Sequence, residues 1–448
     1  MKSMPSARGA ALSPADHKSL ASAIRALSMD AVEAANSGHP GMPMGMADAA
    51  VVLFSEQLRF DPRRPDWPDR DRFVLSAGHG SMLLYSLLHL TGYPDMTIDE
   101  LKRFRQVGSK TPGHPEYGHA AGVETTTGPL GQGFGNAVGM AIAERHLNAR
   151  FGDDLVDHRT WVIAGDGCLM EGISHESASL AGHLGLGRLN VLWDDNHISI
   201  DGPTSLTLSD DVQARFRSYG WHVVACDGHD AASLSAALAE AAADPRPSLI
   251  ACRTTIGFGA PTKAGTAGSH GAPLGEKEIA GAREALGWPS PPFEIPSAVA
   301  AIGQRLGDRG AAEQEAWLGR LEAVDPAIRT EFERVMSGKL PEDLADAVQS
   351  LKATLASDPP KLATRVASQR VIEAIAPVMP ELLGGSADLS GSNNTKVKAQ
   401  HPFTRDDAAG SYLHYGVREH GMAAAMNGMA LHGGVLPYGG TFLVFTDY

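Results

Sequence analysis

Two oxygen-bearing side chains, Asp166 and Asn196, each follow a short apolar segment near the middle of the chain. Asp166 stands in a Gly-Asp-Gly turn after residues 161–164, and Asn196 comes shortly after residues 189–193. A carboxylate, an amide oxygen and a backbone carbonyl just beyond them, most simply that of Ile198, are hard donors that suit Mg²⁺ or Ca²⁺. Such an ion commonly takes its remaining ligands from phosphates, and the glycines let the backbone approach a diphosphate closely.

The elements that must position these residues are two strands joined by a helix. Residues 161–164 (WVIA) and 189–193 (LNVLW) are apolar runs typical of buried strands, and the residues between them have helical character. In such a βαβ unit the strands are parallel, so Asp166 and Asn196 both emerge at carboxyl ends, where open α/β sheets bind ligands. Gly-Asp-Gly alone is also common in ordinary turns. The second side chain at the same edge favours a metal and diphosphate site.

Histidines in glycine- and proline-rich loops form a second candidate group. His39 lies in SGHPGMP, His79 in SAGHGS after a predicted strand, and His114 in TPGHPEYG. Helices and strands disfavour such positions, so we do not expect these side chains in the core. One histidine of this kind is usually a surface residue, whereas three in such loops are harder to explain in that way. His270 lies in 256–275, whose glycines and alanines predict a mobile loop that closes over substrate.

A glycine-rich segment precedes the central unit. Residues 125–135 (TTTGPLGQGFG) hold four glycines and one proline ahead of a small-residue helix predicted over 136–144. The G-x-G-x-G pattern is a weak dinucleotide-binding signal, because no strand leads into it and no acidic residue is placed to bind a ribose. We interpret the segment as backbone shaped to fit a ligand.

Composition indicates an acidic globular protein. The chain has 448 residues, 43% of them hydrophobic, and a formal net charge of −14. This length predicts two or three domains, and the negative charge argues against nonspecific nucleic-acid binding, which requires clustered Lys and Arg. The three cysteines lack metal-ligand spacing, so neither a disulfide framework nor a zinc site is expected. Neither a membrane span nor a secretory signal is recognisable, so we expect a cytoplasmic protein.

Alternating helical and extended patterns predict a parallel sheet flanked by helices. In the first part of the chain we expect helices over 14–35, 82–90, 211–218 and 233–243, and strands over 73–75, 222–225 and 248–253. Charged, alanine-rich residues 277–355 are predicted to be helical. A second β/α pattern has a helix over 364–376, a strand over 382–384 and a final apolar strand in GTFLVFTDY.

The segments GDGCLMEGISHE and DDNHISIDG around Asp166 and Asn196 resemble those of transketolases, which are thiamine diphosphate enzymes. The similarity extends from about Ser13 to Tyr448. The set SGHPGMP, PGHPE and GSHGAPLG disfavours the rival deoxyxylulose-phosphate synthase, whereas dihydroxyacetone synthase shares much of it. The resemblance implies an α/β thiamine diphosphate-binding fold with three domains. We assign them as follows: a tail over 1–13, the diphosphate-binding domain over 14–330, a linker over 331–360, an incomplete pyrimidine-binding domain over 361–448, and an absent C-terminal domain.

The resemblance also implies roles for individual residues. Ligands of Mg²⁺ or Ca²⁺ would be Asp166, Asn196 and the carbonyl of Ile198. Contacts to thiamine diphosphate would come from Gly167, Asn196, His79, His270, the backbone of Gly128, Pro129 and Leu130, and a pyrimidine pocket of Phe442 and Phe445. Sugar hydroxyls would meet His39, His114 and His270. The sugar phosphate would bind Arg365 and Ser392. By periodicity alone, Phe442 and Phe445 are equally consistent with strand core, and an isolated Arg365 with a solvated charge.

Glu419 completes the implied site, in a homodimer whose active sites lie between subunits. It would hold a proton at the cofactor's pyrimidine nitrogen across the interface. The implied reaction is reversible transfer of a two-carbon ketol unit from xylulose 5-phosphate or sedoheptulose 7-phosphate to ribose 5-phosphate or glyceraldehyde 3-phosphate. That reaction belongs to the pentose phosphate pathway or Calvin cycle. The alternatives are a truncated, inactive protein that binds cofactor or a partner, and a dihydroxyacetone synthase-like enzyme.

Overall fold

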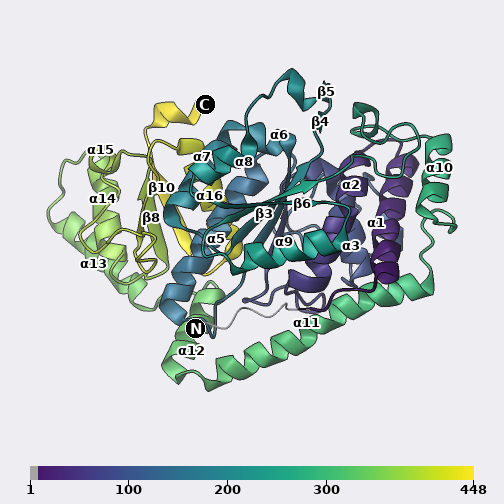
Figure 1. Ribbon diagram of the computed structural model, residues 1–448. Helices are drawn as coiled ribbons and strands as arrows, with labels where there is room; N and C mark the ends of the chain where they lie inside the picture. The colour runs from purple at the N-terminus through teal and green to yellow at the C-terminus, as the bar shows by residue number, and fades with distance from the viewer. Residues whose placement is uncertain (1–8, 448) are drawn as a thin grey trace. The chain divides into compact units, whose positions relative to one another are not determined.

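The computed structural model of the protein describes residues 9–447 (Figure 1). Most of the predicted tail therefore lies outside the described residues. The described chain divides into two compact units. The first comprises the residues up to Phe134, His158–His175 and Gly187–Ala316, and the second comprises Gly135–Asp157, Glu176–Leu186 and the residues from Trp317 onward.

The first unit is built on a five-stranded sheet, all of whose strands are parallel. In spatial order the strands are β1 (Arg72–Leu75), β2 (Thr160–Gly165), β3 (Leu189–Asp195), β7 (Ser248–Arg253) and β6 (His222–Asp227). The central strands β2 and β3 are buried along almost their whole length, which explains their apolar sequences. Their register pairs Gly165 with Asp194. The predicted parallel α/β sheet is therefore confirmed.

Helices cover this sheet, and the larger ones match the predictions. The helix α1 (Pro14–Ala34) begins as expected, with Ser13 accepting a hydrogen bond from the backbone N–H of Asp16 at 3.1 Å. It packs on α2 (Gly41–Val52) and α3 (Ser81–Leu90), while α9 (Ala231–Ala243) packs on β6 and β7. The other helices of the unit are α4 (Ile98–Lys102), α6 (Asp166–Met170), α8 (Val212–Ser218), α10 (Glu276–Leu286) and the first part of α11 (Ser297–Ala323).

Short elements form the connections of the first unit. They are the π-helical turn η1 (Leu53–Gln57), the 3₁₀ turns η2 (Gly78–Gly80), η3 (Thr204–Leu206) and η4 (Ala267–Ser269), and the antiparallel pair β4 (Ile198–Ser199) and β5 (Gly202–Pro203).

The second unit contains a three-stranded parallel sheet in the order β10 (Leu436–Gly440), β8 (Leu382–Ser386) and β9 (Tyr412–His414). Its larger helices are α5 (Gln132–Phe151), α7 (Gly172–Leu184), α12 (Pro326–Met336), α13 (Asp343–Ser357), α14 (Thr364–Ile375) and α16 (Glu419–His432), and its shortest is α15 (Ser390–Asn393). The helix predicted over 136–144 is thus longer than expected at both ends. Gly139 and Gly428 let α5 and α16 cross closely. A Cβ at Gly139 would lie 1.9 Å from a backbone oxygen of α16, and a Cβ at Gly428 would lie 1.8 Å from a backbone oxygen of α5.

The strand predicted in the final segment GTFLVFTDY is wrong. The last strand, β10, ends at Gly440, and Leu443–Asp447 form the 3₁₀ turn η5. Within the sheet β10 pairs with β8, and their last pair joins Gly440 to Ser386, where β8 itself ends. In the part of the chain that the structure describes, no strand pairs with the residues after Gly440, so their apolar character does not make a strand.

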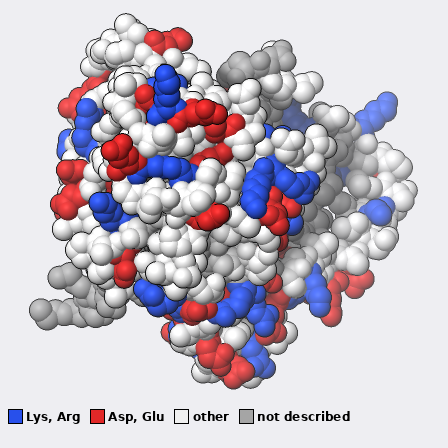
Figure 2. Space-filling model, turned by 90° about the vertical axis from the view of Figure 1, so that its right-hand side faces the viewer, with Lys and Arg blue, Asp and Glu red and all other residues white. Residues whose placement is uncertain are grey.

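Surface charge, the apolar character of the helices and the state of the cysteines bear on the predicted class of protein. On the face shown in Figure 2, basic and acidic side chains are interspersed among uncharged residues. No helix within residues 9–447 combines the length and apolar character required to cross a membrane. The three cysteines are free and buried.

Candidate functional site

Asp166 lies at the carboxyl edge of the first sheet, as the βαβ pattern predicted. It is the first residue of α6, directly after β2, and only 5% of its surface is exposed. Its Oδ1 accepts a hydrogen bond from the indole Nε1 of Trp193 at 3.0 Å, whereas its Oδ2 is buried and has no hydrogen-bond partner in the described chain. Burial, together with the nearby charge of Asp194, raises the pKa of Asp166 to about 7.

Asn196 and Ile198 follow β3 at the same edge. The side-chain Nδ2 of Asn196 donates to Oδ2 of Asp194 at 2.9 Å, and its Oδ1 accepts the backbone N–H of Ile198 at 2.9 Å. Between them His197 takes a positive φ of 59°, which turns the chain into β4. The amide of Asn196 is therefore held in one orientation, with its carbonyl oxygen keeping a second lone pair for another partner.

Asp194 is a site residue that was not predicted from the sequence. It is fully buried at the end of β3, and its Oδ1 accepts a hydrogen bond from the hydroxyl of Thr254. Burial raises its pKa to about 6. Two carboxyl groups with raised pKa values thus lie at one sheet edge, and each would be stabilised in its ionised form by a cation. The Asp-Asp-Asn sequence at the strand end was the available signal.

The predicted metal and diphosphate set fits this geometry. Asp166 has a buried oxygen without a partner, and a Cβ at Gly165 would meet nothing within 4 Å, so the backbone there faces open space. The set supplies one carboxylate, an amide oxygen and a carbonyl, a donor combination that suits Mg²⁺. In residues 9–447 no group of three or more His, Cys, Asp or Glu side chains is placed to hold a metal, so a site there depends on amide and backbone oxygens.

Four histidines from separate loops form a cluster, here called the imidazole cluster. The ring centroid of His39 lies 5.2 Å from that of His79, 5.8 Å from that of His270 and 6.3 Å from that of His114. His79 and His270 stack, with centroids 5.0 Å apart. All four are half-buried, as expected for loop residues outside the core. The structure thus brings together every histidine predicted for the site.

Burial keeps the imidazole cluster neutral. It lowers the pKa of His79 to about 3 and that of His39 to about 4, and the neighbouring imidazoles add to the effect. Burial also lowers the pKa of His114 and His270. The ring nitrogens Nδ1 of His39 and His270 are buried and have no hydrogen-bond partner within the described residues. Neutral imidazoles can both donate and accept, which suits the hydroxyl groups of a sugar.

Arg105 is a second residue that the sequence did not reveal. Its charge contributes to lowering the pKa of both His39 and His114, and its Nη1 donates to the hydroxyl of Ser37 at 2.8 Å. The segment around it, KRFRQ, reads as an ordinary charged surface. Only the fold places this guanidinium beside the imidazole cluster.

The Gly128–Leu130 segment touches both parts of the site. Gly128 has a φ of 151°, and a Cβ there would lie 3.3 Å from Cγ of His114. At the other end of the segment, Leu130 lies close to Gly167. A Cβ on Gly167 would be 2.8 Å from Cδ1 of Leu130. The absence of side chains at Gly128 and Gly167 therefore lets this loop pack against the histidine loop and the turn that carries Asp166. Pro129 lies between these two contacts.

The remaining predicted residues lie in the second unit. Glu419 is the half-buried first residue of α16, and Glu176, which the sequence analysis passed over, accepts the Gly421 N–H of the same helix turn at 2.6 Å. Phe442 and Phe445 are brought together, with ring centroids 6.0 Å apart, and Phe442 is 42% exposed rather than part of a strand core.

Arg365 and Ser392 are both exposed. Arg365 is the second residue of α14, and Ser392 lies in the short helix α15. Their predicted role in binding a sugar phosphate remains a prediction.

Comparison with known proteins gives two family matches. Residues 16–341 match the family described as "Transketolase, thiamine diphosphate binding domain", and residues 360–448 match "Transketolase, pyrimidine binding domain". Curated transketolases of Cereibacter sphaeroides and Rhodobacter capsulatus are 59% and 58% identical to this chain over 96% and 97% of its length. The chain spans 65% and 64% of these relatives.

Solved structures agree with these matches. A transketolase from Leishmania mexicana superposes with a TM-score of 0.91 at 45% identity, covering 96% of this chain and 65% of that one. A transketolase from Pichia stipitis, solved in complex with sedoheptulose 7-phosphate, superposes with a TM-score of 0.91 at 44% identity, covering 97% of this chain and 66% of that one.

Proposed function

Because the chain belongs to the transketolase family, we propose that the protein transfers a two-carbon ketol unit reversibly from a ketose phosphate to an aldose phosphate. The chain carries the thiamine diphosphate binding domain of the family, as its motifs predicted. The observation that carries the proposal is the buried Asp166 carboxylate, which has one unpartnered oxygen and follows the open backbone at Gly165. Such a group is suited to a divalent metal that bridges to a diphosphate.

Residues of the first unit would hold the cofactor. Asp166, Asn196 and the carbonyl of Ile198 would bind Mg²⁺ or Ca²⁺, and the Gly167 and Gly128–Leu130 backbone would approach the diphosphate. When bound, thiamine diphosphate supplies the electron sink for breaking and forming the bond beside a ketose carbonyl. The raised pKa of Asp166 supports its role, because a metal ion would stabilise the charged carboxylate that burial disfavours.

The imidazole cluster would bind and orient the sugar. His39, His114 and His270 would contact the donor's hydroxyl groups, and His79 and His270 would contact the cofactor. Because burial lowers all four pKa values, each ring is neutral at pH 7 and offers one donor and one acceptor. A neutral ring can accept a hydroxyl proton and return it, as general acid–base chemistry of sugars requires.

Residues of the second unit would complete the site. Glu419 would hold a proton at the pyrimidine ring nitrogen, and Phe442 and Phe445 would face that ring. Arg365 and Ser392 would bind the sugar phosphate, for which the planar guanidinium of Arg365 is suited. We place Glu419 opposite the cofactor of the other subunit in a homodimer. The match to a pyrimidine binding domain and the exposure of Phe442 support this arrangement.

The cellular setting follows from the proposed reaction. We propose a cytoplasmic enzyme of the pentose phosphate pathway or Calvin cycle that acts on xylulose 5-phosphate, sedoheptulose 7-phosphate, ribose 5-phosphate and glyceraldehyde 3-phosphate. A relative solved with sedoheptulose 7-phosphate supports this substrate class.

A coupled ketol-transfer assay tests the proposal. Turnover of xylulose 5-phosphate and ribose 5-phosphate should require both thiamine diphosphate and Mg²⁺, and Glu419→Gln should bind cofactor normally while exchanging the thiazolium C2 proton orders of magnitude more slowly. Mixing Glu419→Gln with Asp166→Ala subunits should restore roughly one working site per mixed dimer, because both lesions then fall in the same site and leave the other site intact. Wild-type C2 exchange in Glu419→Gln would exclude the proposed role of Glu419.

A further inference from the structure

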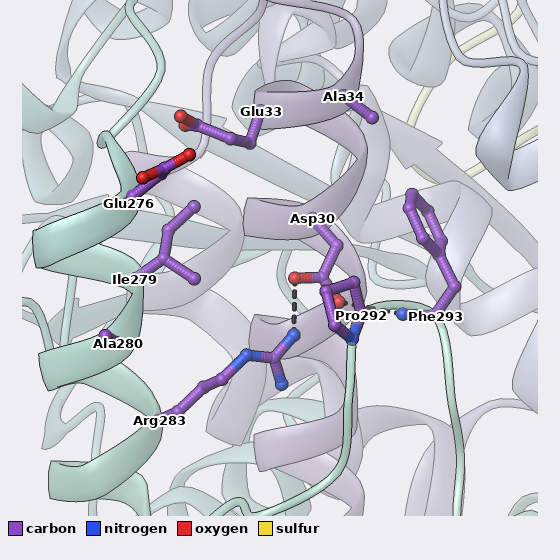
Figure 3. A pocket seen from close by; sticks show the side chains of 9 residues that line it. All are labelled: Asp30, Glu33, Ala34, Glu276, Ile279, Ala280, Arg283, Pro292 and Phe293. Carbon is purple, nitrogen blue, oxygen red and sulfur yellow. Dashed lines mark hydrogen bonds and ion pairs between the residues drawn. The ribbon is translucent and has the colours of Figure 1, made fainter.

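A cavity of about 360 Å³ lies between α1, α10 and the segment that follows α10 (Figure 3). It is separate from the residues of the candidate site, and every residue that lines it belongs to the first unit. Its lining is mainly apolar, with Ala34 from α1, Ile279 and Ala280 from α10, and Pro292 and Phe293 from the following segment. A volume of this size accommodates a small organic molecule.

An ion pair fixes one side of the cavity. Oδ1 of the buried Asp30 lies 2.5 Å from Nη2 of Arg283, and Oδ2 accepts the Phe293 N–H at 3.0 Å. Arg283 also donates to the carbonyl of Ser290 at 2.7 Å. The charges of Asp30 and Arg283 therefore compensate each other, so neither is free for a ligand.

Phe293 is held in an unusual conformation at this cavity. Its φ of 61° lies in the left-handed region, which is costly for a bulky residue, and the hydrogen bond to Asp30 holds it there. Its half-buried ring forms part of the cavity wall (Figure 3). The strained backbone of Phe293 thus places its aromatic ring at the cavity and not in the core.

Two glutamates line another part of the cavity. Glu33 comes from α1 and Glu276 from α10, and Figure 3 draws the side chains of both. Glu33 accepts the Gly275 N–H at 3.0 Å, and no hydrogen bond or ion pair joins Glu276 to the rest of residues 9–447. Because the nearby Arg283 is paired with Asp30, the cavity carries an excess of negative charge.

We propose that this cavity binds a small organic cation. Its ammonium group would lie between Glu33 and Glu276, and its apolar body would pack on Ile279 and the ring of Phe293. The charge complementarity excludes an anion, and the apolar lining favours an organic amine over a hydrated metal ion, which requires several oxygen ligands. The aromatic ring of Phe293 adds apolar contact area for the body of the ligand.

Binding would also link two helices. A cation bound by both Glu33 and Glu276 would join α1 to the first turn of α10. That turn follows Gly275, whose N–H is already held by Glu33. We therefore expect slower amide hydrogen exchange in residues 276–286 when the cavity is occupied.

Calorimetric titration with phenethylamine tests the proposal, with 2-phenylethanol as the neutral analogue of the same shape. We expect phenethylamine to bind about tenfold more tightly than the alcohol, and Glu276→Gln and Glu33→Gln each to remove most of that difference. Glu284→Gln is the matched control, because Glu284 is an exposed residue of the same helix that does not line the cavity. It should leave phenethylamine binding unchanged.

Ala280→Phe provides a second variant that does not change charge. Ala280 is exposed on α10, so a larger side chain there should fill the cavity entrance without disturbing the core and should abolish phenethylamine binding. Hydrogen exchange in residues 276–286 should slow with phenethylamine and not with 2-phenylethanol. The proposal is overturned by equal affinity for the two compounds, by undiminished binding in Ala280→Phe, or by the absence of phenethylamine binding to the unaltered protein.

Discussion

In both parts of the candidate site, the carboxylates at the sheet edge and the imidazole cluster, burial favours the neutral form of each group, but it shifts the pKa in opposite directions. At Asp166 and Asp194 burial raises the pKa, so the neutral form carries a proton. At His39 and His79 burial lowers the pKa, so the neutral form lacks one. A bound cation would therefore change the protonation of the carboxylates and leave that of the imidazoles unchanged.

The two parts also make stability depend on pH in opposite directions. Between the ordinary pKa of Asp166, 3.8, and its value of about 7 in the fold, the native state binds more protons than the unfolded chain, so stability falls as pH rises. The ordinary pKa of His39 and His79 is 6.5, and their values in the fold are about 4 and about 3, so stability falls as pH falls through this window. One part of the site is thus suited to a cation and the other to uncharged hydroxyl groups.

The largest expected effect comes from removing the central carboxylate. Asp166→Ala should weaken Mg²⁺-dependent binding of thiamine diphosphate by more than about 100-fold, because it removes a direct metal ligand. Calorimetry on the folded variant measures this, with Asp201→Asn, an exposed position in a nearby turn, as the control. Unchanged cofactor affinity in Asp166→Ala would refute the metal assignment.

Acidification should also weaken metal binding, because protonation neutralises the same carboxylate. A metal must displace the proton that Asp166 holds below its pKa of about 7, so Mg²⁺ affinity should fall about tenfold for each pH unit below that value. Asp194, with a pKa of about 6, should steepen the fall at lower pH. Mg²⁺ titrations from pH 5 to 8 would show this, and an affinity independent of pH would contradict it.

Removing the indole donor should give a smaller effect on the same carboxylate. Trp193→Phe removes the hydrogen bond from Nε1 to Oδ1 of Asp166, which favours the ionised carboxylate. We expect Mg²⁺ affinity at pH 7 to fall by about tenfold, as for the loss of one hydrogen bond to a charged group. The loss should diminish at pH 9, where Asp166 is ionised in either protein. A loss that does not change with pH would indicate a packing defect.

The imidazole cluster should show the smallest response. Because the pKa values of His39 and His79 lie near 4 and 3, their ring carbon resonances should not shift between pH 5.5 and 8 in NMR spectra. The same histidines in the urea-unfolded chain should titrate near 6.5 and provide the reference. Titration of either ring near neutral pH in the folded protein would remove the contrast between the two parts of the site.

Much of the site could be predicted from the sequence because it depends on local features. The apolar segments before Asp166 and Asn196 predicted strands with these two residues at their carboxyl ends. The strands β2 and β3 lie where those segments predicted. Glycine and proline beside His39 and His114 indicated loops, since neither residue type supports a helix or strand interior. The final segment was predicted wrongly because its apolar residues fit a strand, whereas within residues 9–447 no strand pairs with them.

The sequence by itself therefore predicted at which ends of which elements the candidate residues stand, because hydrophobic periodicity and glycine and proline placement act over a few neighbouring residues. Only the tertiary structure decided their electrostatics. Trp193 reaches Asp166 and Thr254 reaches Asp194 across strands, and Arg105 lies near His39 although 66 positions separate them in the printed sequence. Burial and charge at a site are properties of all the atoms around it, and most of those atoms come from distant parts of the chain.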